Sequence, residues 1–193
     1  MAKLYFRYGV MGSSKSAQAL ITKFNYEEQG MRVWLIKPVA DTRYGADKVH
    51  SRIGLEQPAD VIDDDMDLYE VFRDREREFY DVIIVDEAQF LQPAHVEQLR
   101  EIVDYYNVPV FCFGLRTDFR TRLFPGSARL FELADSVTEL KTVCTCGGKA
   151  MVNARIDAEG RVVTEGEQFL LGGNESYRPM CYKCWKLKSK SEK

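Results

Sequence analysis

The first 140 residues alternate between two patterns of hydrophobic and polar positions. Short apolar runs typical of buried strands are followed by stretches in which apolar residues recur every three or four positions, as on one helix face. The apolar runs predict strands at Leu4–Tyr8, Val33–Ile36, Val82–Val85, Val110–Phe113 and Val137–Leu140. The periodic stretches predict helices at about 16–29, 67–79 and 94–106. Such alternation predicts an α/β fold, a mostly parallel sheet with helices on both faces and ligands at the carboxyl ends of the strands.

The pattern changes after about residue 142, where cysteine and glycine become frequent. Strand-like segments at Met151–Ile156 and Arg161–Thr164 flank a turn at Asp157–Gly160, which indicates a hairpin. Residues 186–193 are polar and rich in lysine, which predicts a frayed tail. We therefore expect an α/β domain at residues 1–141 and a small lobe at residues 142–193.

Length and charge narrow the classes of function. With 193 residues, the chain has room for one α/β domain and a small appendage. Its net charge of −3 provides no overall basic surface, so we expect no nucleic-acid partner. No signal peptide and no apolar run of membrane-spanning length is present, so we expect no membrane association. Five cysteines without an export signal favour a reducing compartment, the cytoplasm.

The segment after the first predicted strand is close to a phosphate-binding P-loop. Its sequence, Gly-Val-Met-Gly-Ser-Ser-Lys-Ser at 9–16, departs from G-x-x-x-x-G-K-[ST] only at Ser14. Backbone N–H groups of such a loop hold phosphates, with Lys15 on the outer phosphates and Ser16 on Mg²⁺. The alternative is a glycine–serine turn that caps an ordinary helix. If the backbone at Ser14 needs a positive φ, the serine there costs on the order of 1 kcal/mol.

A second motif follows the apolar strand at Val82–Val85, where Asp86 and Glu87 stand side by side. P-loop enzymes hold Mg²⁺ with an aspartate at the end of such a strand, and Asp86 fits that role. Glu87 could accept a proton from an attacking hydroxyl or water. The alternative is an acidic pair that caps the next helix. Together with the P-loop, the pair predicts an enzyme that uses ATP or GTP with Mg²⁺.

Four cysteines form two closely spaced pairs, Cys144 with Cys146 and Cys181 with Cys184. Two such pairs in a reducing compartment predict a tetrahedral structural Zn²⁺ site. A lobe of about fifty residues buries too little apolar surface to hold its shape without a cross-link. The C-x-C spacing is shorter than usual, and four thiols without a metal are the alternative.

We assign no chemical role to three further residues. Cys112 falls within an apolar strand, which predicts a buried core thiol. His50 and His95 have no partner signature nearby in the sequence.

These motifs, in this order, resemble the type II thymidine kinases over nearly the whole chain. Segments similar to motifs of that family occur at Asp41–Tyr44, Val85–Phe90, Gly114–Phe119, Phe124–Ser127 and Glu167–Tyr177. The last is similar to the loop that clasps thymidine in the family, here called the lasso. The resemblance implies a RecA-like P-loop domain with a zinc-ribbon-like lobe that carries the lasso.

The resemblance also implies an activity, the transfer of the γ-phosphoryl group of ATP to the 5′-hydroxyl of thymidine to give dTMP, with Mg²⁺. It implies that Glu87 is the catalytic base and that Arg43 is a cation for transition-state charge. The ATP and Mg²⁺ site that it implies comprises Gly9, Val10, Met11, Gly12, Ser13, Ser14, Lys15, Ser16, Asp41, Arg43, Asp86, Glu87, Ala88 and Gln89. The nucleoside site that it implies comprises Met11, Leu115, Phe119, Gln168, Phe169, Leu170, Leu171, Gly172 and Tyr177. A homotetramer or homodimer, and feedback inhibition by dTTP, are implied in the same way.

Four alternatives stay open at this point. The acid pair is also similar to that of nucleic-acid-dependent ATPases, although the acidic composition and single nucleotide domain argue against that class. A zinc-bound ATP sensor without catalysis and a kinase of another deoxynucleoside are the second and third. Met11 and Leu115 could also be ordinary core residues.

Overall fold

The computed structural model of the chain describes residues 1–41, 45, 47–74, 80–168 and 176–190. Its centre is a six-stranded sheet with strand order β5-β2-β6-β7-β1-β8 in which every neighbouring pair is parallel. The strands are β1 (Leu4–Tyr8), β2 (Val33–Pro38), β5 (Asp60–Ile62), β6 (Val82–Val85), β7 (Val110–Gly114) and β8 (Ser136–Glu139). The predicted parallel α/β sheet is therefore confirmed. The short strand β5 was not predicted, because its three residues carry no apolar run.

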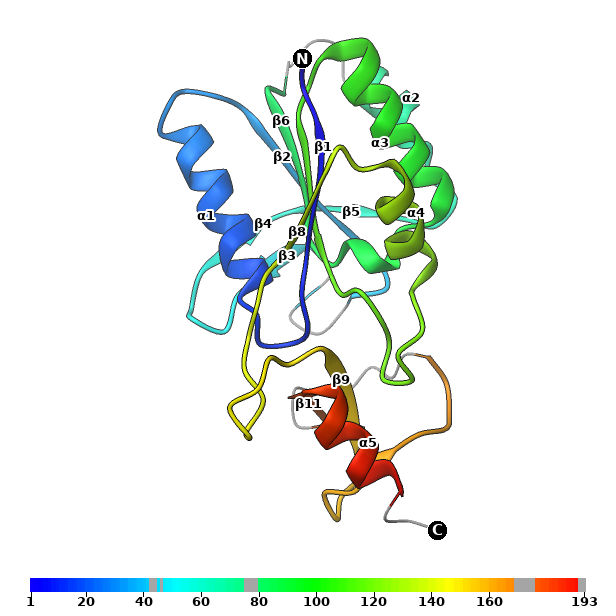
Figure 1. Cartoon of the computed structure of the whole chain (residues 1–193). Helices are drawn as coiled ribbons and strands as arrows, with labels where there is room; N and C mark the ends of the chain where they lie inside the picture. The colour runs from blue at the N-terminus through cyan, green and yellow to red at the C-terminus, as the bar shows by residue number, and fades with distance from the viewer. Residues whose placement is uncertain (42–44, 46, 75–79, 169–175, 191–193) are drawn as a thin grey trace.

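Helices cover both faces of this sheet (Figure 1). Helix α1 (Lys15–Glu27) packs on one face, and α2 (Leu68–Asp74), α3 (Pro93–Tyr106) and α4 (Pro125–Leu133) pack on the other. Successive side chains of each strand point to opposite faces, so Phe6 joins the core under α2–α4 while Tyr5 packs on the α1 side. Because both faces are covered, the central strands are continuously apolar.

The predicted helices agree with α1 and α3 within two residues at each end. The predicted helix at 67–79 corresponds to α2, and its last five positions lie outside the described residues. Helix α4 was missed because it opens with Pro-Gly-Ser, a sequence typical of turns. Gly126 is needed there for close packing, since a Cβ at this position would lie 2.5 Å from the Leu91 carbonyl oxygen.

A smaller antiparallel sheet forms the C-terminal lobe, with β9 (Val152–Ile156) between β10 (Val162–Val163) and β11 (Tyr177–Met180). This confirms the predicted hairpin. The predicted frayed tail from residue 186 is wrong as far as Lys190, because helix α5 (Tyr182–Lys190) continues through it. Trp185 packs into the apolar core of the lobe and anchors this helix. Val10 of the P-loop belongs to the same core, so the lobe packs directly against the phosphate loop.

Two small elements complete the α/β part. Strands β3 (Lys48–His50) and β4 (Glu56–Pro58) pair as an antiparallel hairpin, and a 3₁₀ turn, η1 (Ala88–Phe90), follows β6. The hairpin was not predicted, because its strands are short and largely polar. Among the described residues, no helix combines the length and apolar character needed to cross a membrane.

Candidate active site

The P-loop connects the end of β1 to the start of α1. Its backbone turns through positive φ at Gly12 (77°) and at Ser14 (61°), where glycine is the residue that tolerates the conformation without strain. The ammonium group of Lys15 is buried and donates a hydrogen bond to the Val10 carbonyl at 2.9 Å. Ser14 thus adopts the left-handed conformation that the sequence pattern expects of a second glycine. Its strain is on the order of 1 kcal/mol.

The acidic pair lies at the carboxyl end of β6. Burial, and after it the nearby charge of Glu87, raise the pKa of Asp86 to about 7. A hydrogen bond from the Ser16 side chain and the charge of Lys15 act in the opposite direction on this pKa. The P-loop and the acidic pair are therefore in direct contact through Ser16 and Asp86.

Gln89 is the residue that orients Glu87. Its side chain is buried, and its Nε2 donates to the Glu87 carboxylate at 2.5 Å. Its Oε1 accepts a hydrogen bond from the backbone N–H of Leu115 at 2.8 Å. Because both ends of the amide are bound, the carboxylate of Glu87 is held relative to the segment that follows β7.

Both motifs line one cavity of about 260 Å³ at the carboxyl ends of β1, β2 and β6. Asp41, which follows β2, also lines it and is held by an ion pair with the buried Lys37 at 3.0 Å. The residues that line the cavity are Met11, Gly12, Ser14, Lys15, Ser16, Ala17, Asp41, His50, Ser51, Arg52, Ile53, Asp86, Glu87 and Leu115. The prediction that both motifs share one edge of the sheet is confirmed.

Four of these lining residues, 50–53, come from the β3–β4 hairpin and were missed by sequence reasoning. They include His50, whose Nδ1 lies 3.2 Å from the Glu56 carboxylate. Their contribution depends on how the hairpin folds back over the P-loop, and no local motif signals this.

On the other side of the P-loop, Asn153 connects three segments of the chain. It lies on β9 and is buried. Its Oδ1 accepts a hydrogen bond from the backbone N–H of Met11 at 2.7 Å, and its Nδ2 donates to the Thr117 carbonyl at 3.0 Å. The P-loop, the segment after β7 and the lobe are thereby held together at one side chain.

A second buried polar residue of β9, Arg155, contacts three residues of the predicted nucleoside site: Phe119, Gln168 and Tyr177. Its guanidinium carbon lies 3.8 Å from the centre of the Phe119 ring. Its Nη2 and Nε donate to the Tyr177 hydroxyl at 2.8 and 3.1 Å. Neither Arg155 nor Asn153 was predicted. The signal that could have found them is the pair of polar positions on one face of an otherwise apolar strand.

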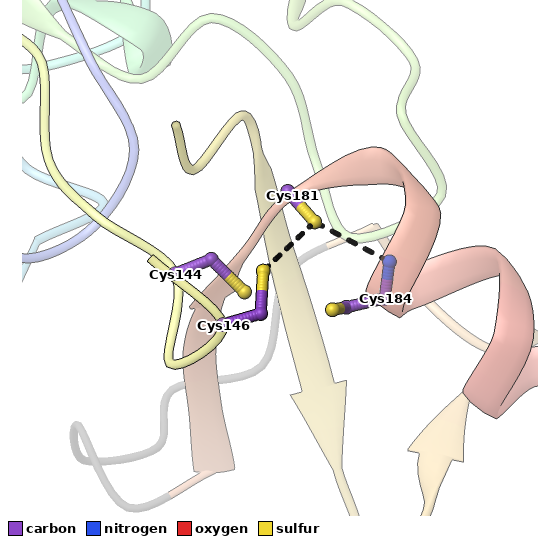
Figure 2. A group of neighbouring side chains, drawn as sticks. All are labelled: Cys144, Cys146, Cys181 and Cys184. Carbon is purple, nitrogen blue, oxygen red and sulfur yellow. Dashed lines mark hydrogen bonds between the residues drawn. The ribbon is translucent and has the colours of Figure 1, made fainter. Parts of the chain in front are cut away.

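The four paired cysteines of the lobe converge in space (Figure 2). Two come from the loop before β9 and two from the junction of β11 and α5, and all four Sγ atoms lie within 4.8 Å of one another. The Sγ atoms of Cys146 and Cys181 are 3.6 Å apart. A tetrahedral site with Zn–S bonds of about 2.3 Å has an S–S edge of roughly 3.8 Å, so the group fits a zinc ion. Backbone hydrogen bonds lower the pKa of Cys144 to about 6, whereas hydrogen bonds with the neighbouring thiols of Cys181 and Cys146 raise the pKa of Cys184 to about 12.

Cys112 and His95, to which no chemical role is assigned, have structural roles. Cys112 is completely buried in β7, as expected of a core thiol. His95 completes a capping box with Gln92 at the start of α3, and its Nε2 lies 3.1 Å from the Met66 carbonyl.

The sequence model of the thymidine kinase family matches residues 2–185. The chain belongs to this family. It is 46% identical over 187 residues to the thymidine kinase of Salmonella typhimurium (strain LT2), covering 96% of this chain and 91% of that one. It is 48% identical over 183 residues to that of Legionella pneumophila (strain Lens), covering 94% and 88%. The thymidine kinase of Enterobacteria phage T4 is 47% identical over 187 residues, 96% of each chain.

Likeness to solved structures is much weaker. The Bacteroides Pif1 bound to ssDNA has 19% identity and a TM-score of 0.39, and the match covers 72% of this chain and 38% of that chain. A match at this level supports no conclusion about function.

Most of the predicted site residues of this member of the thymidine kinase family fall into three groups, while Gly9, Val10, Ser13, Ala88 and Gln89 are not among the residues that line the cavity. One group lines the cavity, with Met11 and Leu115 from the nucleoside set beside the P-loop and the acidic pair. A second group gathers around Arg155. The third group, Arg43, Phe169, Leu170, Leu171 and Gly172, lies outside the described residues.

Proposed function

We propose that the chain is a thymidine kinase that transfers the γ-phosphoryl group of ATP to the 5′-hydroxyl of thymidine, producing dTMP and ADP. The observation that carries this proposal is the shared cavity, which is lined by a P-loop, an acidic pair and the apolar side chains Met11 and Leu115. Such a cavity can hold a phosphate chain beside a flat apolar base. Membership in the thymidine kinase family supports the same substrates.

On the phosphate side, the loop N–H groups and Lys15 would bind the phosphates of ATP. Asp86 and Ser16 present oxygen atoms next to each other, a donor set that suits Mg²⁺. When bound, Mg²⁺ neutralises charge on the transferred phosphoryl group. Asp41 and Arg43 complete the proposed nucleotide site, together with Gly9, Val10, Gly12, Ser13, Ser14, Ala88 and Gln89.

Glu87 is the proposed general base. Its carboxylate lines the cavity and is oriented by Gln89. The proton of the thymidine 5′-hydroxyl passes to this carboxylate as the 5′-oxygen bonds to the γ-phosphorus. The bond from that phosphorus to the bridging oxygen breaks, and ADP leaves with the electron pair. The chemistry requires positioning and charge neutralisation more than covalent help from the protein, so this small set of residues suffices.

Met11, Leu115, Phe119, Gln168 and Tyr177, with Phe169–Gly172, are the proposed nucleoside site. Apolar and aromatic side chains suit the flat thymine ring and its methyl group. The lasso, Glu167–Tyr177, lies in the sequence between Cys146 and Cys181.

We further propose that Cys144, Cys146, Cys181 and Cys184 bind a structural Zn²⁺. The spacing of their Sγ atoms suits a closed four-thiolate site, which leaves no position for a substrate. The division into domains 1–141 and 142–193 is part of the proposal, supported by an apolar core that, Val10 of the P-loop apart, is built from residues of the lobe. Assembly as a homotetramer or homodimer and feedback inhibition by dTTP rest on the family resemblance. The cysteines form no disulfide bonds among the described residues, which favours the reducing cytoplasm.

The test is a phosphorylation assay with thymidine, deoxyuridine and deoxycytidine, each with Mg²⁺ and ATP. We expect dTMP from thymidine at the highest kcat/KM. Phosphorylation of deoxycytidine in preference to thymidine would reassign the substrate. ATP hydrolysis that requires single-stranded DNA, without any nucleoside product, would refute the kinase assignment.

Glu87→Gln tests the base. We expect this variant to lose roughly 10²–10⁴-fold in kcat, because the amide cannot accept the proton. Glu101→Gln, on the exposed side of α3, is the matched control and should leave kcat unchanged. An active Glu87→Gln enzyme would remove Glu87 from this role.

A further inference from the structure

Arg155 is the point at which three separate segments of the chain meet. It is 4% exposed and lies on β9, directed away from the apolar core of the lobe that is built by Val152, Ala154 and Ile156. Its guanidinium group stacks on Phe119 with 3.8 Å from Cζ to the ring centre. It also donates hydrogen bonds to the Tyr177 hydroxyl and, at 3.5 Å, to the Gln168 carbonyl.

Burying the charge of Arg155 costs free energy of folding. Among the residues that the structure describes, no carboxylate lies within ion-pair distance of it, so its partners there are neutral. A buried cation whose partners among the described residues are all neutral stabilises a fold less than an apolar side chain of similar volume would. Packing alone therefore does not account for an arginine at this position.

The planar shape of the guanidinium group does account for it. One face stacks on the Phe119 ring, while its N–H groups at the edge reach the Tyr177 hydroxyl and the Gln168 carbonyl. Lysine carries the same charge but has no flat face and no fork of donors, so it cannot make both contacts. Arg155 thus sets the angle and position of two aromatic rings relative to each other.

Two residues earlier on the same face of β9, Asn153 fixes Met11 and the carbonyl of Thr117. The two polar side chains of β9 together place Phe119 relative to the P-loop. Asn153 does so through the backbone of the loop that carries Phe119, and Arg155 does so through the ring itself.

We propose that Arg155 is a positioning residue for the nucleoside, which holds Phe119 and Tyr177 in the geometry that thymidine needs and leaves the ATP phosphates untouched. The inference rests on the proposed function, because it takes Phe119 and Tyr177 as walls of the thymidine site.

The first experiment compares steady-state kinetics of Arg155→Met and Arg155→Lys with the wild type. Losing hydrogen bonds from a charged group should raise the KM for thymidine by about 10- to 100-fold in both variants. The KM for ATP should stay within about two-fold, since Arg155 does not line the cavity beside the P-loop. Arg161→Met is the matched control, because Arg161 is exposed in the same hairpin and pairs with Asp157 and Glu159. Both KM values should be unchanged in it.

The second experiment asks whether Arg155 acts through Tyr177. Tyr177→Phe removes the acceptor hydroxyl and keeps the ring, and we expect a several-fold rise in the KM for thymidine. In the double variant with Arg155→Met, the effects should be less than multiplicative, because both changes remove the same contact. Tyr177→Phe keeps the half-buried ring, so it tests the inference even if Arg155→Met does not fold.

Three results separate the possible failures. A wild type that phosphorylates thymidine, with an unchanged KM for thymidine in Arg155→Lys and Tyr177→Phe, overturns the positioning role alone. Equal increases in both KM values with a lower Tm mean that Arg155 only supports the fold, and this also overturns it. A wild type that does not phosphorylate thymidine overturns the proposed function, and the inference with it.

Discussion

Replacing Asn153 with alanine should weaken both the fold and the site. The change removes an amide that binds the backbone N–H of Met11 in the P-loop and the backbone carbonyl of Thr117 after β7. Alanine leaves both backbone groups without these partners. The two segments lie far apart in the sequence, and the hydrogen bond from the Gly9 N–H to the Gly114 carbonyl at 3.1 Å is a remaining link between them.

The size of the effect follows from the burial of the two groups. A buried polar group that loses its partner costs about 1–3 kcal/mol. The hydrogen bond to Thr117 is buried, whereas Met11 is only half-buried and its N–H can bind water in the variant. The combined cost for two groups is about 2–6 kcal/mol, and a value near its lower end applies, a loss of about 2–3 kcal/mol in the free energy of unfolding. For a chain of this length that corresponds to a decrease in Tm of about 4–12 °C.

The assay is thermal unfolding followed by circular dichroism, together with steady-state kinetics. Because Asn153 holds the P-loop to the segment after β7, we expect the KM for both ATP and thymidine to rise. Asn107→Gly is the control, since Asn107 accepts one exposed hydrogen bond from the Ala2 backbone and has a positive φ of 54° that glycine tolerates. It should change the free energy of unfolding by less than about 1 kcal/mol. An Asn153→Ala protein as stable as this control, with wild-type kinetics, would refute the reasoning.

Three further predictions concern single features. Ser14→Gly should leave kcat/KM equal or higher, because glycine relieves the strain of a positive φ; a marked loss in the same assay would give the serine hydroxyl a role. Asp86 is an acid whose pKa is raised by burial, so the wild type should lose stability relative to Asp86→Asn as pH rises from about 4 to about 7, with a constant difference above that; a Tm difference independent of pH would contradict this. Metal analysis should find about one zinc per chain, and a chelator should lower the Tm; a ratio well below one would remove the zinc proposal.

The sequence by itself determined the architecture around the site. The apolar runs of β1, β6 and β7 and the periodic faces of α1 and α3 are local signals, readable because buried strands and amphipathic helices repeat over a few residues. The P-loop and the acidic pair are equally local, since each needs only a few neighbouring residues. Their meeting at one sheet edge follows from parallel topology, so it too was predictable.

Local signals failed where an element depends on distant partners. The largely polar β3–β4 hairpin lines the cavity only because it folds over the P-loop. Helix α5 extends through a lysine-rich segment because Trp185 packs into the core of the lobe. Neither packing partner lies close enough in sequence to leave a periodic pattern.

Only the tertiary structure decided how the residues of the proposed nucleoside site are held. Alternation with apolar residues in β9 puts Asn153 and Arg155 on one face of the strand, but it does not say whether that face meets water or protein. Burial makes the difference, because a buried amide or guanidinium group must find hydrogen-bond partners. Here the partners come from the P-loop, the segment after β7 and the two ends of the lasso, Gln168 and Tyr177. The sequence therefore determined the half of the protein that we propose binds phosphate, and the packing of the lobe against it decided the half that we propose binds the nucleoside.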